Sequence, residues 1–262
     1  MKLGIIGYGN MGKAILEGVL KNNAIEGKDI GVFDRNDWKR AEAVKLGAEA
    51  FDDIHDLIGA SDLLLLAIKP NQIEAVANKI RDDLRGKSII SIAAGVTMKR
   101  LEDYFGEDVR LLRVMPNTPA LVKEGAIVFC KEHTLNENEL KFAIKLFQQV
   151  GKVYELGENY IDAVCGLSGA GPAYVSMFIE ALGDGGVKEG LPRKTAYELA
   201  AQTVLGSAKL ALDSGKHPGE LKDMVTSPKG ATIEGVLELE KHNFRYAVSE
   251  AVSKASEKSR NL

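Results

Sequence analysis

The sequence is poor in cysteine and proline. Its 262 residues include two cysteines and seven prolines. Cys130 and Cys165 lie far apart, without a C-x-x-C pair or flanking histidines, which argues against both a disulfide scaffold and a zinc site. We therefore expect no metal centre and a reducing, cytoplasmic setting.

The sequence also lacks a long apolar segment and an excess of either charge. The longest apolar run, Leu63 to Ile68, is far shorter than the roughly 20 residues of a membrane-spanning helix. Only Met1–Ile6 precede the first glycine-rich turn, so we expect no signal sequence and a fold that begins at Met1. Lys and Arg total 34 against 37 Asp and Glu, a net charge of −3. This balance argues against nucleic acid and membrane surfaces as partners.

Strand-like and helical patterns alternate over the first part of the chain. Short apolar runs predict strands at 2–6, 30–33, 63–68, 88–93, 111–114, 126–130 and 152–155. Helical spacing of apolar residues predicts helices at 10–20, 73–84, 98–105 and 137–150. This alternation is typical of an α/β fold with a doubly wound parallel sheet.

After Gly157 the pattern becomes entirely helical. Helices are predicted at 174–182, 194–212 and 230–242, so we divide the chain into residues 1–158 and 159–262. The helical part is crowded with glycine and is too short to enclose a core easily. We therefore expect it to pack against a second copy of the chain, with Tyr174, Phe178 and Leu182 exposed for that purpose.

A glycine motif follows the first predicted strand and opens the first predicted helix. Gly7, Gly9 and Gly12 form G-x-G-x-x-G, in the context that dinucleotide binding requires. Gly7 suits the tight turn, Gly9 lets the backbone approach a pyrophosphate, and Gly12 lets the helix pack on the strand. Asn10 and Met11 then lie at the helix N-terminus, which faces the phosphates.

Two charged residues at the end of the second predicted strand bear on the choice of cofactor. Asp34 lies 22 residues after Gly12, where an acid usually receives the ribose hydroxyl of NAD. Arg35 follows at once, and an arginine there can pair with the extra phosphate of NADP. The pair could also be a solvated ion pair at a turn. The residues themselves therefore leave the choice between NADH and NADPH open.

Three further segments leave the carboxyl ends of predicted strands, where ligands of such sheets bind. They are the stretches that contain Ala67, Lys69 and Pro70, then Ala94 and Gly95, and finally Asn117 between two prolines. Each could be an ordinary strand exit or turn, or else part of a nicotinamide pocket.

A loop in the helical part could bind a small carboxylate. Residues 226–230 read Thr-Ser-Pro-Lys-Gly and lead into a predicted helix that contains Thr232. Hydroxyls beside a helix N-terminus suit an anion, but Ser227 or Thr232 could equally cap the helix. Gly166–Ala170 departs from the G-x-S-x-G elbow, which argues against a serine hydrolase.

Together these motifs strongly resemble the pyrroline-5-carboxylate reductase family. The resemblance spans nearly the whole chain: GIIGYGNMG at the N-terminus, LAIKP at 66–70, AAGVT at 93–97, MPNTP at 115–119, GLSGAGPAY at 166–174 and HPGELKDMVTSPKGATI at 217–233. The last two segments are the most specific. The resemblance implies an N-terminal Rossmann domain, a C-terminal all-helical dimerisation domain, and a site between them that uses the partner subunit.

The resemblance also implies functions for particular residues. Substrate carboxylate and ring nitrogen would bind to Ser227, Gly230, Ala231 and Thr232, with Thr232 as the catalytic residue. The cofactor, NADPH or NADH, would be lined by Gly7, Gly9, Met11, Gly12, Lys69, Pro70, Ala94 and Asn117. The motif and strand-end positions add Asn10, Asp34, Arg35, Ala67 and Gly95 as expected cofactor-binding residues. Two departures stand out: Lys229 replaces a glycine of the family's S-P-G-G motif, and Asp53-Ile54-His55 lies where the family often has an asparagine.

The implied reaction is hydride transfer from NAD(P)H to the C=N carbon of pyrroline-5-carboxylate, which yields L-proline in the last step of proline biosynthesis. An iminium is already electrophilic, so positioning and electrostatics suffice. Two alternatives are a catalytically inactive NAD(P)-binding paralogue and a 3-hydroxyacid dehydrogenase. The second family needs a lysine four residues after the last glycine of its helix, and Val175 stands there when counted from Gly171.

Overall fold

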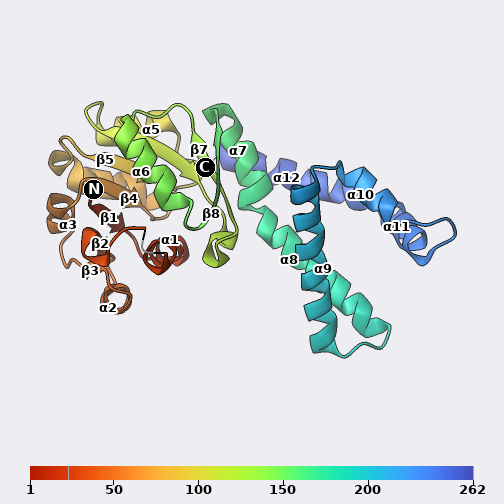
Figure 1. The fold of residues 1–262 in the computed structure, drawn as a ribbon. Coiled ribbons are helices and arrows are strands. Elements are labelled where there is room, and N and C mark those ends of the chain that lie inside the picture. The colour runs from red at the N-terminus through yellow and green to blue at the C-terminus, as the bar shows by residue number, and fades with distance from the viewer. Residues whose placement is uncertain (23, 262) are drawn as a thin grey trace. The chain divides into compact units, whose positions relative to one another are not determined.

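The computed structural model describes residues 1–22 and 24–261, and these form two units (Figure 1). The first unit comprises Met1–Ala170 and Lys254–Leu262, and the second comprises Gly171–Ser253. We call them the α/β unit and the helical unit. The domain boundary at residue 158, which the sequence places where strands give way to helices, stays a prediction.

The α/β unit contains an eight-stranded sheet in the part of the chain that the structure describes. Its strand order is β3-β2-β1-β4-β5-β6-β7-β8. The strands are β1 (Leu3–Ile6), β2 (Ile30–Phe33), β3 (Glu49–Ala50), β4 (Leu63–Leu66), β5 (Ser88–Ser91), β6 (Arg110–Met115), β7 (Gly125–Cys130) and β8 (Gly151–Leu156). All neighbours are parallel except β6 and β7, which pair antiparallel at Val114 and Phe129. The expected Rossmann-type fold is confirmed, with one antiparallel pair that the sequence did not reveal.

Helices cover both faces of this sheet (Figure 1). On one face lie α1 (Asn10–Lys21), α2 (Asp37–Lys45) and α6 (Glu137–Phe147), and on the other lie α3 (Ile54–Ala60), α4 (Ile73–Ile80) and α5 (Met98–Phe105). Strand β4 shows why both faces need covering. Leu63 and Leu65 pack into the first apolar cluster, whereas Leu64 and Leu66 pack into the second. Unbroken apolar strands of this kind are typical of buried parallel sheets.

The order of the strands creates a switch point beside β1. The chain first moves from β1 to β2 and β3 on one side, and then returns to place β4 on the other side of β1. The connections at the carboxyl ends of β1, β2 and β4 therefore diverge, which leaves a crevice where ligands of such sheets bind.

Two glycines of α8 let the first two helices of the helical unit pack closely. The helices of this unit are α8 (Gly171–Lys188), α9 (Arg193–Ser214), α10 (Pro218–Met224), α11 (Ala231–Lys241) and most of α12 (Phe244–Arg260). The last residues of α12 belong to the α/β unit, and so does the short helix α7 (Ile161–Val164). A Cβ at Gly183 would lie 3.0 Å from the ring of Tyr197, and one at Gly186 would lie 3.2 Å from the Cβ of Ala196. The sequence patterns did not predict α3, α10 or α12.

The apolar surface expected on α8 differs in part from the prediction. Tyr174 and Phe178 are half-buried, because the Tyr174 hydroxyl donates to the Ala251 carbonyl at 3.2 Å and the Phe178 ring lies 5.7 Å from that of Phe244. These two aromatic residues pack within their own chain. Leu182 is exposed, as expected. No helix in the described residues is long and apolar enough to cross a membrane.

Candidate active site

The glycine motif forms the turn between β1 and α1. Gly7 has a φ of +96°, and its amide donates to the Phe33 carbonyl at 2.8 Å, which ties the turn to the end of β2. A Cβ at Gly12 would overlap the carbonyl oxygen of Gly7, whereas nothing lies within 4 Å of a Cβ at Gly9. Gly12 therefore allows α1 to pack on the turn, and Gly9 leaves its backbone open to a ligand.

Helix α1 begins with unpaired backbone donors at this turn. Gly9 is its N-cap, and no side chain among the described residues caps it. Asn10 starts the helix, while Met11 packs partly into the apolar cluster beneath. The first amides of a helix have no partner within the helix and carry a partial positive charge. The turn thus fits a dinucleotide pyrophosphate, because the space at Gly9 is open and the helix amides face it, in addition to the match with the sequence motif.

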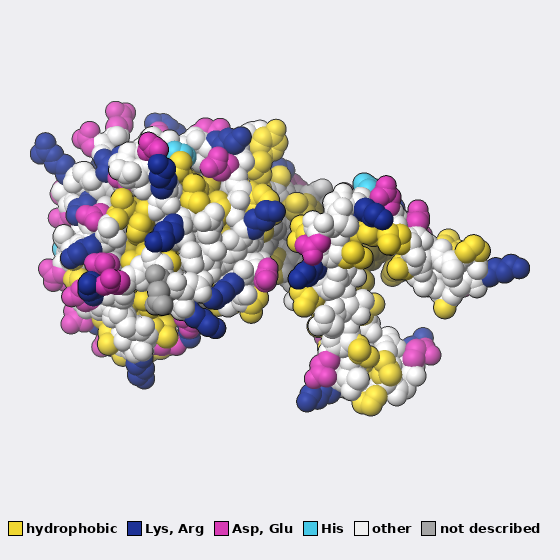
Figure 2. All heavy atoms as spheres, viewed as in Figure 1, with side chains coloured by type: hydrophobic (Ala, Val, Ile, Leu, Met, Phe, Trp, Pro, Cys, Tyr) yellow, Lys and Arg dark blue, Asp and Glu magenta, His cyan; other side chains and the backbone are white. Residues whose placement is uncertain are grey.

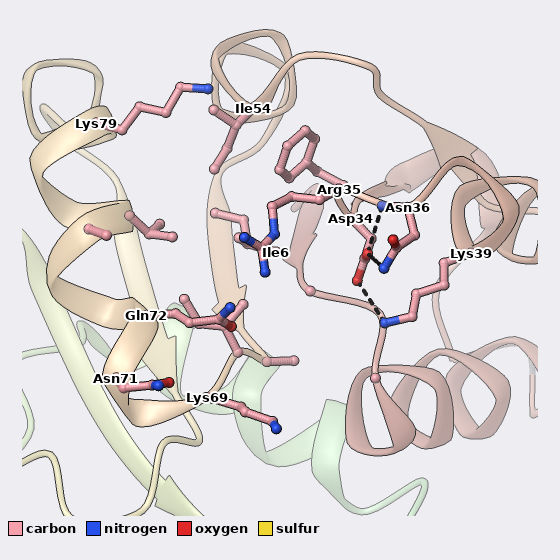
Figure 3. Close-up of a pocket in the computed structure, with 17 residues that line it drawn as sticks. Ile6, Asp34, Arg35, Asn36, Lys39, Ile54, Lys69, Asn71, Gln72 and Lys79 are labelled. Carbon is pink, nitrogen blue, oxygen red and sulfur yellow. Dashed lines mark hydrogen bonds and ion pairs between the residues drawn. The ribbon is translucent and has the colours of Figure 1, made fainter.

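A cleft of about 540 Å³ opens at the switch point (Figure 3). It is lined mainly by the ends of β1, β2 and β4, by the turn after Lys69 and by one side of α4. The expected cofactor residues Gly7, Gly9, Asp34, Arg35, Ala67 and Lys69 all lie in its wall. Pro70 begins the short 3₁₀ turn Pro70–Gln72 directly after Lys69. Residues from distant parts of the sequence therefore meet at this cleft, while their contact with a cofactor stays a prediction.

Asp34 is a buried carboxylate held by several donors. Its Oδ2 accepts from the Tyr8 amide at 2.8 Å and from Lys39 Nζ at 3.3 Å, and its Oδ1 accepts from the amide and side chain of Asn36 at 3.0 and 3.1 Å. Burial alone would raise the pKa of Asp34, but the amides of Tyr8 and Asn36 and the Lys39 ammonium outweigh it and hold that pKa below its ordinary value. Asp34 is therefore ionised at neutral pH.

The expected residues from β5 and β6 lie outside the wall of this cleft. Gly95 has a φ of +72°, and Ala94 packs beside Met115 and Val164. The Asn117 side chain donates to the Ser168 carbonyl at 3.0 Å and accepts from the Ala126 amide at 2.9 Å. Asn117 thus fastens its loop to β7 and to the π-helical turn Cys165–Gly169. Its side chain stabilises this loop whether or not the loop also contacts a cofactor.

The Thr226–Gly230 loop precedes α11 in the helical unit. Gly230 is the N-cap of α11, and no side chain of the described residues bonds to this helix start. Neither Ser227 nor Thr232 caps the helix, so the capping alternative is wrong. The Gly230 amide donates to the Ser227 carbonyl at 3.0 Å, and Ser227 Oγ lies so close that a Cβ at Gly230 would overlap it. The free helix amides therefore begin at Ala231.

The backbone conformation at Lys229 explains why the family usually has a glycine at this point of the motif. Its φ is +60°, in the left-handed region that favours glycine. Its side chain is exposed and makes no hydrogen bond or ion pair with any residue that the structure describes. The backbone at this position therefore has the conformation that a glycine adopts at lowest cost.

Several lining residues of the cleft were missed by the sequence analysis. They are Asn36, Lys39, Ile54, Asn71, Gln72 and Lys79. Ile54 belongs to the Asp53-Ile54-His55 stretch that departs from the family pattern. Lys39 lies on α2, five residues after Asp34, and this closeness in sequence could have indicated it as a residue of the site. Lys79, at the end of α4, carries no such signal, because only the packing of α4 brings it to the cleft.

The glycine turn and the cleft at the switch point define a dinucleotide-binding protein of the Rossmann class. The model for pyrroline-5-carboxylate reductase dimerisation matches residues 158–262, and that for NADP oxidoreductase, coenzyme F420-dependent, matches residues 2–95. Over the whole chain, pyrroline-5-carboxylate reductases of Methanosarcina acetivorans and Escherichia coli are 43% and 41% identical, with 97% and 98% of their lengths covered. The chain belongs to the pyrroline-5-carboxylate reductase family.

A solved structure agrees with this assignment. The pyrroline carboxylate reductase of Plasmodium falciparum, solved with NADP bound, superposes with a TM-score of 0.92 at 34% identity. The match covers all of this chain and 97% of the other. Within residues 1–22 and 24–261, no group of histidine, cysteine and acidic side chains could hold a metal ion.

Proposed function

We propose that this protein reduces the C=N bond of pyrroline-5-carboxylate to L-proline with NADPH. The observation that carries the proposal is the full-length match to curated reductases, because it includes both the cleft and the Thr226–Thr232 loop. The NADP bound in the Plasmodium falciparum relative supports the choice of cofactor. The reaction is the last step of proline biosynthesis.

The α/β unit would hold the cofactor. When bound, the nicotinamide ring of this cofactor supplies the hydride for the imine carbon. Gly7 and Gly9 let the backbone approach the pyrophosphate, the amides of Asn10 and Met11 face it, and Lys69 adds a positive charge in the same cleft. We assign the remaining expected residues, Gly12, Ala67, Pro70, Ala94, Gly95 and Asn117, to shaping the turn and the strand ends.

The helical unit would hold the substrate. The amides of Ala231 and Thr232 lie in the first turn of α11 and have no partner within the helix, so they suit the substrate carboxylate. Ser227 lies beside this helix start and can add its hydroxyl. The Thr232 hydroxyl would lie at the ring nitrogen, where its oxygen can accept a hydrogen bond from the iminium N–H. Since an iminium nitrogen is already protonated, these residues need to orient the substrate but not to supply a strong acid.

The proposal is tested by mixing the full chain with NADPH and pyrroline-5-carboxylate. We expect NADPH absorbance to fall while an equal amount of proline appears in the chromatogram. A reaction mixture without the imine controls for background oxidation. If NADPH is bound but not oxidised, the protein is an inactive paralogue, and if 3-hydroxyacids reduce NADP⁺ instead, it is a dehydrogenase. Either outcome overturns the proposal.

We also propose that the active form is a homodimer through the helical unit. In Gly171–Ser253, all of which the structure describes, the buried residues are Gly183, Ala196 and Ala200. Apolar side chains, yellow in Figure 2, are exposed over much of the helical unit instead. Met177 and Leu212, for example, are 69% and 75% exposed. Such a surface and the match to the dimerisation family both favour a second copy. The cytoplasmic setting stays a prediction.

A further inference from the structure

The cleft at the switch point has an excess of positive charge. Its wall contains the cationic side chains of Arg35, Lys39, Lys69 and Lys79. Asp34 is the one acidic residue among the described residues that line it. Cations gathered in a cleft attract anions, and more strongly as the ligand's negative charge rises. The cleft has more positive charge than the pyrophosphate of a dinucleotide requires. NADPH carries one phosphate more than NADH and could use this additional charge.

The single acidic side chain has little capacity left for a ligand. An ionised carboxylate offers about four lone-pair sites. Asp34 already accepts four hydrogen bonds, two at each oxygen, from Tyr8, Lys39 and Asn36 (Figure 3). A ribose hydroxyl could bind only by displacing one of these donors. The residue is also 9% exposed. Asp34 is thus built into the protein as an acceptor for its own backbone and side chains.

Lys39, in contrast, keeps donors for a ligand. An ammonium has three N–H donors, and Lys39 Nζ gives one to Asp34 at 3.3 Å, a long contact. Its side chain is 22% exposed and lines the cleft. Because Asp34 holds Nζ at the end of β2, the ammonium is placed with part of its charge and two donors available.

Arg35 supplies a second, unengaged cation at the same strand end. The Arg35 side chain reaches into the cleft (Figure 3). It has no hydrogen bond or ion pair with any residue in the described part of the chain, so all five of its N–H donors are available. The same cleft is thus lined by a planar guanidinium and an ammonium, two groups that each suit a phosphate dianion.

We propose that Lys39, together with Arg35, selects NADPH over NADH by binding the 2′-phosphate of the adenosine ribose. Asp34 is a positioning residue that holds Lys39 and the glycine turn, and it does not accept the ribose hydroxyls. The end of β2 is where Rossmann proteins distinguish the two cofactors, which places these residues at the discriminating position. The inference rests on the proposed use of NADPH.

The test uses the unliganded full chain and two adenosine probes that differ only in this phosphate. Calorimetric titration compares 2′,5′-ADP with 5′-AMP. We expect the wild type to bind 2′,5′-ADP at least about tenfold more tightly, as one charge-assisted contact allows. Lys39→Met should weaken 2′,5′-ADP by about 10- to 100-fold and leave 5′-AMP within about threefold. Arg35→Met should act in the same way.

A matched variant separates a specific contact from general loss of charge. Lys79 lines the same cleft but reaches in from α4, on the other side from Lys39 (Figure 3). Lys79→Met removes the same charge and should weaken 2′,5′-ADP by less than about threefold, since screened charges without contact contribute little. Equal losses in the Lys39 and Lys79 variants would overturn the proposal, as would equal losses for both probes.

Asp34→Asn tests the positioning role. If Asp34 accepted the ribose hydroxyls, this variant would lose affinity for both probes. In our proposal it keeps its 5′-AMP affinity within about threefold and weakens the binding of 2′,5′-ADP alone, because Lys39 loses the carboxylate that holds it. A melting curve checks that the variant is folded. Should it unfold, the Lys39 and Arg35 variants, whose side chains lie at the protein surface, still decide the question.

These binding measurements also separate the inference from the proposed reaction. Probe selectivity without proline formation would refute the reductase activity alone. Proline formation without probe selectivity would refute the roles of Lys39 and Asp34 alone.

Discussion

The α/β unit and the helical unit differ in how much apolar surface each buries by itself. In the α/β unit, helices on both faces leave the β4 residues Leu63–Leu66 without solvent exposure. In the helical unit, leucines such as Leu205 and Leu212 are 58% and 75% exposed. Hydrophobic burial contributes in proportion to area, so the α/β unit is stabilised within one chain. In the proposed homodimer, the helical unit would gain its missing burial from the second copy.

The comparison is tested most severely by placing a charge on the exposed apolar surface of α9. We expect Leu205→Glu to weaken the dimer by at least about 4 kcal/mol, or about a thousandfold in the dissociation constant, because a twofold interface buries the change twice. Light scattering over a range of concentrations measures this. Val44→Glu on α2 is the matched control, since Val44 is 51% exposed in the unit with its own core. If both variants stay dimeric, α9 is not an interface.

The substrate loop gives the next largest effect, on turnover but not on folding. Thr232 makes no capping bond, so Thr232→Ala should leave Tm nearly unchanged. Loss of its hydroxyl from the imine nitrogen in the transition state should lower kcat/KM by about 10- to 1,000-fold. Steady-state kinetics and a melting curve together check both parts.

Thr232→Ser is the control for this prediction, because it keeps the hydroxyl and should retain much of the activity. A Thr232→Ala enzyme with full activity per folded molecule would remove Thr232 from the site. Substrate binding would then fall to Ser227 and the free amides of α11.

A third prediction concerns a buried ion pair of the α/β unit. Glu139 is 5% exposed and accepts from Arg110 Nη2 at 2.6 Å, from Ser88 Oγ at 2.6 Å and from the Asn136 amide at 3.0 Å. Burial would raise the pKa of Glu139, but the bonds from Arg110, Ser88 and Asn136 outweigh it and lower that pKa. The carboxylate therefore stabilises the fold above its ordinary pKa of about 4.3.

We expect Glu139→Gln to lower the free energy of unfolding by about 2 kcal/mol at neutral pH, since Arg110 loses its charged partner. The difference from the wild type should shrink as the pH falls from about 4.3 through the lowered pKa, because both proteins are then uncharged at this position. Denaturant titrations at several pH values measure it. Unlike the Leu205→Glu effect, it should not vary with protein concentration. Glu137→Gln, on the exposed face of α6, should change little.

The same contrast explains which parts of the molecule could be read from the sequence. The Gly7–Gly12 turn depends on local backbone demands, and the sequence therefore located it and the adjoining Asp34. The cleft residues Asn71 and Lys79 depend on how α4 packs, which no local pattern records. Helix α12 gives no clear signal in the sequence for another reason: its exposed apolar residues, such as Tyr246, blur the amphipathic pattern of the helix. In the proposed homodimer, α12 would have one apolar face for its own chain and one for the second copy.

The pairing of β7 lay beyond the sequence patterns as well. Apolar runs indicate strands but not their direction, and β7 lies antiparallel to β6 while β8 lies parallel to β7. The capping alternative at α11 failed because the patterns could not distinguish Gly230 from Ser227 or Thr232 as the N-cap. In each case the missing information is three-dimensional.

The smallest expected effect concerns Lys229 and Lys123, one in each unit. Both are non-glycine residues with positive φ, +60° and +66°. Glycine relieves the left-handed strain of roughly 1–2 kcal/mol but also loosens the unfolded chain, so each Lys→Gly change should stabilise the protein by about 0.5 kcal/mol. Tm should rise by roughly 1–2 °C in both variants. Because the Lys229 side chain is exposed and its charge is screened, Lys229→Gly should alter KM for pyrroline-5-carboxylate by less than about threefold. A tenfold rise in KM, with Lys123→Gly unaffected, would instead show that the Lys229 ammonium binds the substrate carboxylate.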